Sequence, residues 1–195
     1  MIKKNISTFF IAFAILLFSG CASRTSFPAS YEVEEEVRGF DLPKLPEDGK
    51  ALVYIIRPES FSFSFWPLFV NAGDGGTNFV IYVDQIETKN SMGYTNTEEY
   101  IYFNLMPGTH KIFSSAIYNV APGKDEGLSA SLNYDSIELD VQAGDVIFIE
   151  QETKFGFPYS RNRLHNDYSI SEGKYRIKNL SLGRIYKLDK NSNFK

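Results

Sequence analysis

Residues 136–150 of the chain read SIELDVQAGDVIFIE, and this stretch contains the pattern that decides the fold. In its first half, Ile137, Leu139 and Val141 alternate with polar residues, which places the apolar side chains on one face of a strand. Ala143-Gly144-Asp145 then gives a turn signal, and the apolar run VIFIE follows at 146–150. The stretch therefore predicts an antiparallel hairpin.

Similar strand-like runs lie N-terminal to this hairpin. The run ALVYII at 51–56 is continuously apolar, which is typical of a strand buried on both faces, and FVIYVD at 79–84 has the same character. Residues 99–105 alternate between apolar and polar side chains. Met106-Pro107-Gly108-Thr109 then predicts a type II turn, because proline fixes φ at the second position and glycine accepts a positive φ at the third. Residues 110–117 are expected to return as the antiparallel partner of 99–105.

The rest of the pattern also indicates an all-β fold. Residues 174–185 predict one or two further short strands, and no window of the mature chain gives a convincing amphipathic helix of useful length. About seven to eight strands without crossover helices predict an antiparallel β-sandwich. Residues 59–77, 118–134 and 153–173 are expected to form extended loops.

The first of these loops carries three phenylalanines that alternate with serine: Phe61, Phe63 and Phe65. Their rings either pack into the sandwich as part of a strand or meet a membrane or a partner. We expect at least one ring in the core and exposure of residues 66–70, because Pro67 and the glycines after Asn71 break any strand there.

The composition limits the class of protein. Of the 195 residues, 43% are hydrophobic and 15% aromatic, which is enough to build a buried core and excludes a wholly disordered chain. The 14 glycines and 8 prolines follow no period, which excludes collagen-like repeats. The single cysteine excludes an intramolecular disulfide and argues against a cysteine metal cluster.

The N-terminus has the pattern of a secretory signal peptide. Lys3 and Lys4 precede the apolar run FFIAFAILLF at 9–18, which ends at Ser19-Gly20. Ten residues are too few to cross about 30 Å of hydrocarbon, so the run does not predict a permanent transmembrane helix. Removal of residues 1–20 leaves 18 basic and 24 acidic residues, and a net-acidic exported chain argues against nucleic acid as a partner.

The sequence Leu17-Phe18-Ser19-Gly20-Cys21 resembles the lipobox of bacterial lipoproteins. The resemblance implies cleavage before Cys21 and acylation of its thiol, so Cys21 is the expected lipid-attachment residue and membrane lipid its expected partner. Several acyl chains, at about 0.8 kcal/mol per buried methylene, make such attachment stable. In these lipoproteins an aspartate after the cysteine signals retention in the inner membrane, and Ala22 therefore favours the outer membrane, facing the periplasm. The alternative is an ordinary signal peptide with an unrelated buried cysteine nearby.

These signals divide the chain into four parts. Residues 1–20 are the signal peptide, 21–50 are the lipidated cysteine with a flexible acidic tether, 51–188 are the β-sandwich and 189–195 are a C-terminal tail. The tether is expected because its prolines and its acidic run at 32–36 come with no sustained apolar period. That acidic run either forms one short helical turn or is solvated. Fully extended, residues 22–50 would reach about 100 Å.

Candidate catalytic groups are few. His110 and His165 are the only histidines; we expect His110 to hydrogen-bond its own turn and His165 to lie in an exposed polar loop. The sequence has no nucleophile elbow, no zinc-protease motif and no phosphate loop. No catalytic residue, metal site or cofactor is therefore expected.

Four short motifs together resemble a known family. They are Ala51-Leu-Val-Tyr54-x-x-Arg57-Pro58, Tyr82-Val83-Asp84, Pro107-Gly108-x-His110 and Ala143-Gly144-x-x-x-Phe148. This set is similar to the bacterial family named domain of unknown function 2846, found largely in small exported lipoproteins, and the resemblance runs from about Lys50 to Leu188. It implies an all-β sandwich, transthyretin-like or PEGA-like, with no established catalytic residues.

The leading functional expectation is a non-enzymatic, outer-membrane-anchored lipoprotein whose sandwich binds an envelope protein or polysaccharide. One alternative is a hydrolase of envelope polymers that uses a carboxylate pair, such as Asp84 with a glutamate brought near by folding. A further alternative is a purely structural subunit of an envelope assembly.

Overall fold

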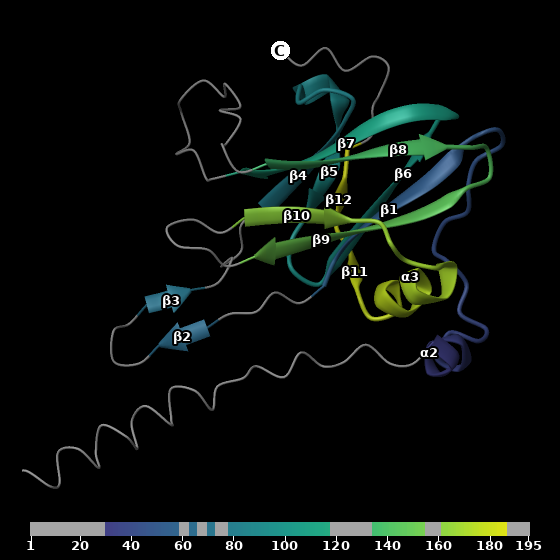
Figure 1. The fold of residues 1–195 in the computed structure, drawn as a ribbon, viewed down its shortest axis with the longest axis horizontal. Coiled ribbons are helices and arrows are strands. Elements are labelled where there is room, and N and C mark those ends of the chain that lie inside the picture. Colours follow the sequence, from purple (N-terminus) through teal and green to yellow (C-terminus); the bar gives the residue numbers. More distant parts are fainter. Residues whose placement is uncertain are drawn as a thin grey trace, which may run out of the picture.

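The computed structural model describes residues 30–58, 63–65, 70–72, 78–117, 134–154 and 161–186, and its main feature is a pair of stacked five-stranded sheets (Figure 1). The first sheet contains β1 (Ala51–Arg57), β6 (Glu99–Leu105), β9 (Val146–Lys154), β10 (Arg161–His165) and β11 (Ser181–Leu182). The second contains β4 (Asn78–Val83), β5 (Ser91–Thr95), β7 (Gly108–Ile117), β8 (Tyr134–Val141) and β12 (Arg184–Ile185). The strand orders are β10-β9-β1-β6-β11 and β12-β5-β4-β7-β8, and the predicted all-β sandwich is confirmed.

Strand β1 is the centre of the first sheet. It pairs antiparallel with β6 and parallel with β9, so that Tyr54 lies between Tyr102 and Phe148. All seven of its residues are buried, as the continuous apolar run predicted. Because successive side chains of a strand point to opposite faces, Val53 and Ile55 enter the space between the sheets. There they join inward-facing residues of both sheets, among them Ile81, Val83, Ile101, Phe103, Leu105, Ile112, Leu139, Val141, Ile149 and Leu164.

Both predicted hairpins are wrong, because each turn joins strands of different sheets. Strand β6 pairs with β1 and β11 whereas β7 pairs with β4 and β8, so residues 106–107 form a corner between the sheets. The connection from β8 to β9 is a second corner of the same kind. Gly108 and Gly144 still supply positive φ values of 139° and 90° at these corners. An alternating pattern predicts which face of a strand is buried, but it does not specify the neighbouring strand.

The C-terminal part of the domain contains a helix and two short strands, whereas the sequence predicts only short strands there. Residues Ile170–Ile177 form helix α3, which begins with a capping box between Ser169 and Glu172. Two short strands follow it: β11 pairs with β6 in the first sheet, and the chain then crosses to the second sheet, where β12 pairs with β5. Gly93 of β5 permits this crossing, because a Cβ atom at that position would lie 2.2 Å from the carbonyl oxygen of Arg184.

A second apolar cluster covers the outward face of the first sheet. Its buried members are Leu52, Tyr54, Ile56, Tyr100, Phe148 and Ile177. Helix α3 approaches closely because Gly173 faces the Phe148 ring, and a Cβ atom there would lie 2.3 Å from the ring. This face is therefore closed by a helix, as a central strand buried on both sides requires.

Residues 30–50 also pack on this face, which corrects the expected flexible tether for that part of the chain. Helix α2 (Ser30–Glu36) contains the fully buried Val33. Phe40 and Leu42 pack against the outward cluster. The hydroxyl of Tyr54 donates to the carbonyl of Lys44 at 2.7 Å and accepts from the Lys44 amide at 3.0 Å. The few apolar residues that dock are spaced irregularly among acids and prolines, so the sequence shows no apolar period there.

The aromatic loop is described only as backbone. Strands β2 (Phe63–Phe65) and β3 (Val70–Ala72) pair with each other, and in the described part of the chain neither pairs with the two larger sheets. Phe61 and the side chains of Phe63 and Phe65 lie outside the described residues, so the placement of the three rings stays a prediction.

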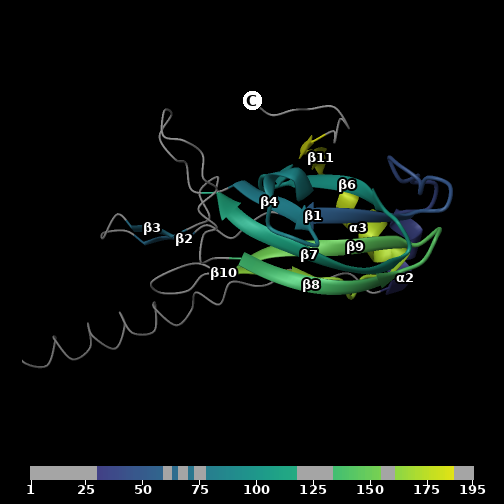
Figure 2. The same ribbon diagram turned by 90° about the horizontal axis from the view of Figure 1, so that it is seen from above.

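The sandwich has two distinct ends (Figure 2). We call one the corner end: β1 begins there, the connections β6–β7 and β8–β9 lie there, and the amide of Gly144 donates to the carbonyl of Lys50 at 2.9 Å. We call the other the loop end, where β1, β7 and β9 finish and β4, β8 and β10 begin. Among the described residues, no helix is long and apolar enough to cross a membrane.

Replacing Tyr54 tests the docking of residues 30–50. Burial raises the pKa of Tyr54 to about 12, whereas tyrosine in an unfolded chain titrates near about 10. The unfolded state therefore ionises first, and the stability supplied by the neutral side chain is present below pH about 10 and is lost as the pH rises through about 12. We expect Tyr54→Phe to lower the free energy of unfolding by about 1 kcal/mol at neutral pH and to make its loss above pH about 10 shallower.

Urea unfolding of the chain from Ala22 onward, repeated across this pH range, measures both effects. Tyr31→Phe is the control, because Tyr31 is an exposed tyrosine of α2. Identical alkaline slopes for Tyr54→Phe and the unmodified chain would contradict the buried position of the hydroxyl.

Candidate functional site

The inter-sheet core changes from apolar to polar at the loop end. Five buried polar side chains, each from a different strand, lie one inward-facing position beyond the apolar core on β1, β5, β7, β9 and β10. We call this set the polar layer; its members are Arg57, Thr95, Ser114, Gln151 and Asn162. The strand registers align these positions, because β1 ends at Arg57 where β9 continues past Glu150 and β5 ends at Thr95.

Hydrogen bonds link the polar layer across the two sheets. The Thr95 hydroxyl donates to Oε1 of Gln151 at 2.6 Å, and Nε2 of Gln151 donates to the Ser114 hydroxyl. Nδ2 of Asn162 donates to the Ser114 carbonyl at 3.0 Å. Gln151 of the first sheet thus bridges two hydroxyls of the second, and a buried network of this kind fixes how the sheets stack.

Arg57 places a charge inside this layer. Its side chain is only 1% exposed, its Nη1 donates to the Thr95 carbonyl at 3.0 Å, and its guanidinium lies 4.7 Å from the centre of the Phe79 ring. Burying a guanidinium is costly unless its donors are satisfied, and a carbonyl and an aromatic face both offset that cost. Guanidinium, amide and hydroxyl groups are poor general acids and bases near neutral pH. The layer therefore offers hydrogen bonding and charge rather than acid–base chemistry.

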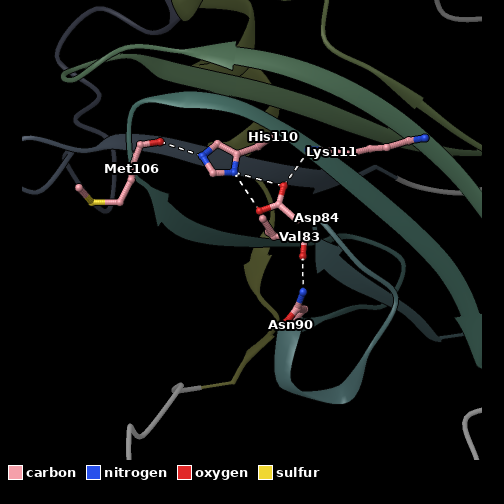
Figure 3. Close-up of polar contacts among 6 residues, drawn as sticks. All are labelled: Val83, Asp84, Asn90, Met106, His110 and Lys111. Carbon is pink, nitrogen blue, oxygen red and sulfur yellow. Dashed lines mark hydrogen bonds and ion pairs between the residues drawn. The ribbon is translucent and has the colours of Figure 1, made fainter.

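The structure pairs Asp84 with His110 at the corner end (Figure 3). Nδ1 of His110 lies 3.2 Å from the Asp84 carboxylate, and Nε2 donates to the Met106 carbonyl at 2.9 Å, which confirms that His110 hydrogen-bonds its own turn. The Asp84 carboxylate also accepts from the Lys111 amide at 3.1 Å. Both ring nitrogens are thus engaged within the fold, and the pair ties the end of β4 to the β6–β7 corner.

Asp84 has a left-handed backbone, with φ at +64°. Aspartate tolerates this conformation better than most residues, and here its carboxylate is held by His110 and Lys111 of β7. The carboxylate contacts His110 and Lys111, so the glutamate partner proposed for it in a hydrolase is not among these contacts.

A third polar cluster joins β9 to α3 on the outward face of the first sheet. Glu150 accepts from the Tyr168 hydroxyl and forms an ion pair with Arg176 at 2.8 Å. Burial, followed by the nearby Glu150 carboxylate, raises the pKa of Tyr168 well above its usual value. His165 ends strand β10, half-buried and 3.2 Å from Glu152, which corrects the expected exposed loop.

The sequence analysis missed Glu150, Tyr168 and Arg176. A glutamate that ends the apolar run VIFIE was the available signal, since a charge so close to a buried strand needs a partner. Cys21, the expected lipid-attachment residue, lies outside the described residues. Within the described ranges, no group of three or more His, Cys, Asp or Glu side chains could hold a metal ion.

Substitutions in the polar layer test whether the hydrogen bonds of Gln151 mainly satisfy buried polar groups or add stability of their own. Gln151→Ala removes the partner of two buried hydroxyls and leaves a void, so we expect the free energy of unfolding to fall by about 2 to 4 kcal/mol. Replacing the three linked side chains together, with Thr95→Val, Ser114→Ala and Gln151→Leu, removes the unsatisfied groups and is expected to return stability to within about 1 kcal/mol of the unmodified chain.

Urea unfolding measures both effects, and Gln142→Ala at the exposed β8–β9 corner is the control. If the triple variant proved as unstable as the single one, the hydrogen-bond explanation of this layer would be wrong.

Comparison with known protein families gives a match over the central part of the chain. The family model described as protein of unknown function (DUF2846) matches residues 47–162, which span all five residues of the polar layer and the Asp84–His110 pair. No curated protein and no solved structure matches the chain. Since the match covers more than half of the 195 residues, the chain belongs to the DUF2846 family, whose function is unknown.

Proposed function

We propose that the protein is a lipoprotein of the outer membrane, anchored through acylated Cys21 and facing the periplasm. The observation that carries this proposal is the sequence Leu17-Phe18-Ser19-Gly20-Cys21, directly after a basic start and an apolar run of ten residues. Ala22 in place of an aspartate supports the outer rather than the inner membrane. Membrane lipid is thus one partner, held covalently.

The sandwich is proposed to be a non-catalytic binding module for an envelope protein or polysaccharide. Its loop end supports this function, because the segments that connect β1 to β4, β7 to β8 and β9 to β10 all leave the sandwich there. Connecting loops held on a rigid scaffold are the usual place for binding residues. The polar layer lies at this end of the sandwich and provides a rigid, hydrogen-bonded base.

The bonding of the titratable groups supports a non-catalytic module over a hydrolase. Asp84 is engaged by His110 and Lys111, and Glu150 by Tyr168 and Arg176. A carboxylate that acts as nucleophile or acid must reach a substrate atom; Glu150 is buried against Tyr168 and Arg176, and the half-exposed Asp84 is held by His110 and Lys111.

Substituting Cys21 tests the anchor. Cys21→Ser removes the thiol that carries the lipid, so we expect loss of acylation and accumulation of the uncleaved precursor in the inner membrane. Mass spectrometry of the N-terminal peptide and membrane fractionation measure this, with Ser19→Ala as a control that keeps a small residue before the cysteine. Normal processing and outer-membrane fractionation of Cys21→Ser would refute the anchor.

Photo-crosslinking tests the binding module. A crosslinking residue at Tyr134, which is 54% exposed at the loop end, is expected to capture an envelope partner in intact cells. The matched control is Leu182, which is 52% exposed on β11, an edge strand of the first sheet, whereas Tyr134 lies on β8, an edge strand of the second. A crosslinking residue at Leu182 is expected to capture no partner. Capture at Leu182 and not at Tyr134 would place the binding surface elsewhere. Degradation of an envelope polymer by the purified domain, abolished by Asp84→Asn, would instead support the hydrolase.

A further inference from the structure

The N-terminal part of the described chain is fixed to the domain. Val33 and Val37 of the α2 region are buried, α2 packs beside α3, and Nζ of Lys178 contacts the Glu36 carboxylate at 3.3 Å (Figure 1). The chain therefore enters the domain at α2, next to the outward cluster of the first sheet. From there it runs to the corner end, where β1 begins at Ala51.

This docking shortens the expected reach of the anchor. Eight residues lie between Cys21 and Ser30, and even a fully extended chain spans at most about 30 Å from one to the other. A tether that ran freely to residue 50 would reach about three times as far. This inference rests on the proposed function, in which Cys21 carries the lipid. With the lipid at Cys21, the domain is held close to the bilayer by its α2 side.

Large apolar side chains are exposed on the segments around this point of entry. They are Tyr31 on α2, Leu45 between α2 and β1, Met106 at the β6–β7 corner and Ile170 at the start of α3, each between 56% and 69% exposed. Amphipathic surfaces of this kind bury such side chains in the interface between headgroups and acyl chains. Of the other exposed large apolar residues in the described part of the chain, Tyr134 lies at the loop end, Leu182 lies on β11 and Tyr186 follows β12.

The charge of the same region selects the kind of membrane surface. Residues 30–50 and 166–178, which carry Tyr31, Leu45 and Ile170, together contain nine acidic and six basic residues, so an anionic lipid surface would repel this net-acidic region. A surface dominated by zwitterionic phospholipid accepts the apolar side chains without that repulsion.

We infer that the protein rests on a zwitterionic phospholipid surface through a membrane-contact face formed by Tyr31, Leu45, Met106 and Ile170. In this orientation the corner end and α2 meet the bilayer and the loop end points away from it. The loop end, with its exposed Tyr134, thereby faces partners in the periplasm.

Site-specific fluorescence in vesicles tests the orientation. The acylated full-length protein is reconstituted in vesicles of phosphatidylethanolamine and phosphatidylcholine, with one environment-sensitive label per molecule. Cys21 is the only native cysteine and is blocked by the lipid, so Leu45→Cys, Ile170→Cys and Tyr134→Cys each give a unique labelling site. All three positions are exposed, and circular dichroism checks that each variant is folded.

We expect the labels at positions 45 and 170 to be quenched severalfold less by the neutral aqueous quencher acrylamide in vesicles than in detergent-free soluble protein that lacks residues 1–21. The label at position 134 is expected to show no such protection. The protection at 45 and 170 should weaken when phosphatidylglycerol replaces phosphatidylcholine.

The outcomes distinguish this inference from the anchor itself. Equal quenching at positions 45, 170 and 134 in acylated, vesicle-bound protein would overturn the orientation and leave the anchor intact. Greater protection in phosphatidylglycerol vesicles would overturn the choice of a zwitterionic surface. Protein that carries no lipid on Cys21 by mass spectrometry and does not bind vesicles would refute the anchor, and the orientation with it.

Discussion

The structure depends on one constraint, which is that strand β1 is buried on both faces and along its whole length. Val53 and Ile55 require a second sheet on one side, and Leu52, Tyr54 and Ile56 require a cover on the other. The second sheet, helix α3 and residues 37–42 meet these two requirements. The close approach of α3 depends on Gly173, which leaves room for the Phe148 ring. Residues 37–42 belong to a segment with the sequence pattern of an acidic tether, but they pack on this apolar surface, which would otherwise face water.

The connections between the sheets give the sandwich its two unlike ends. Short corners at 106–107 and 142–145 carry the chain from one sheet to the other at the corner end, where Asp84 and His110 brace one of them. Longer connecting segments leave from the loop end. An antiparallel hairpin at either corner would have kept both strands in one sheet and removed this asymmetry. This asymmetry supports the proposal that one end of the domain faces the membrane and the other binds a partner.

Three sets of polar side chains link different elements of the domain. Gln151 links Thr95 and Ser114, Glu150 links Tyr168 and Arg176, and Asp84 links His110 and Lys111. Each set joins elements that are distant in the sequence, so its first effect is to define one packing arrangement. The polar layer differs from the other two in its position, because it lies beneath the loop end with a buried arginine at its centre.

The sequence by itself determined most of the central strands and their buried faces. The export signal that it also predicts lies outside the described residues. Continuous and alternating apolar runs identify β1, β4, β6, β8 and β9, because side chains alternate along any strand whatever its neighbour is. Pro107-Gly108 and Ala143-Gly144 likewise show where the chain turns. Only the tertiary structure decided which sheet each strand joins, since a turn signal is the same for a hairpin and for a corner. It also decided the polar layer, because residues 57, 95, 114, 151 and 162 meet only after five strands align. The docking of residues 30–50 likewise depends on the apolar outward face of the first sheet and not on a local sequence pattern.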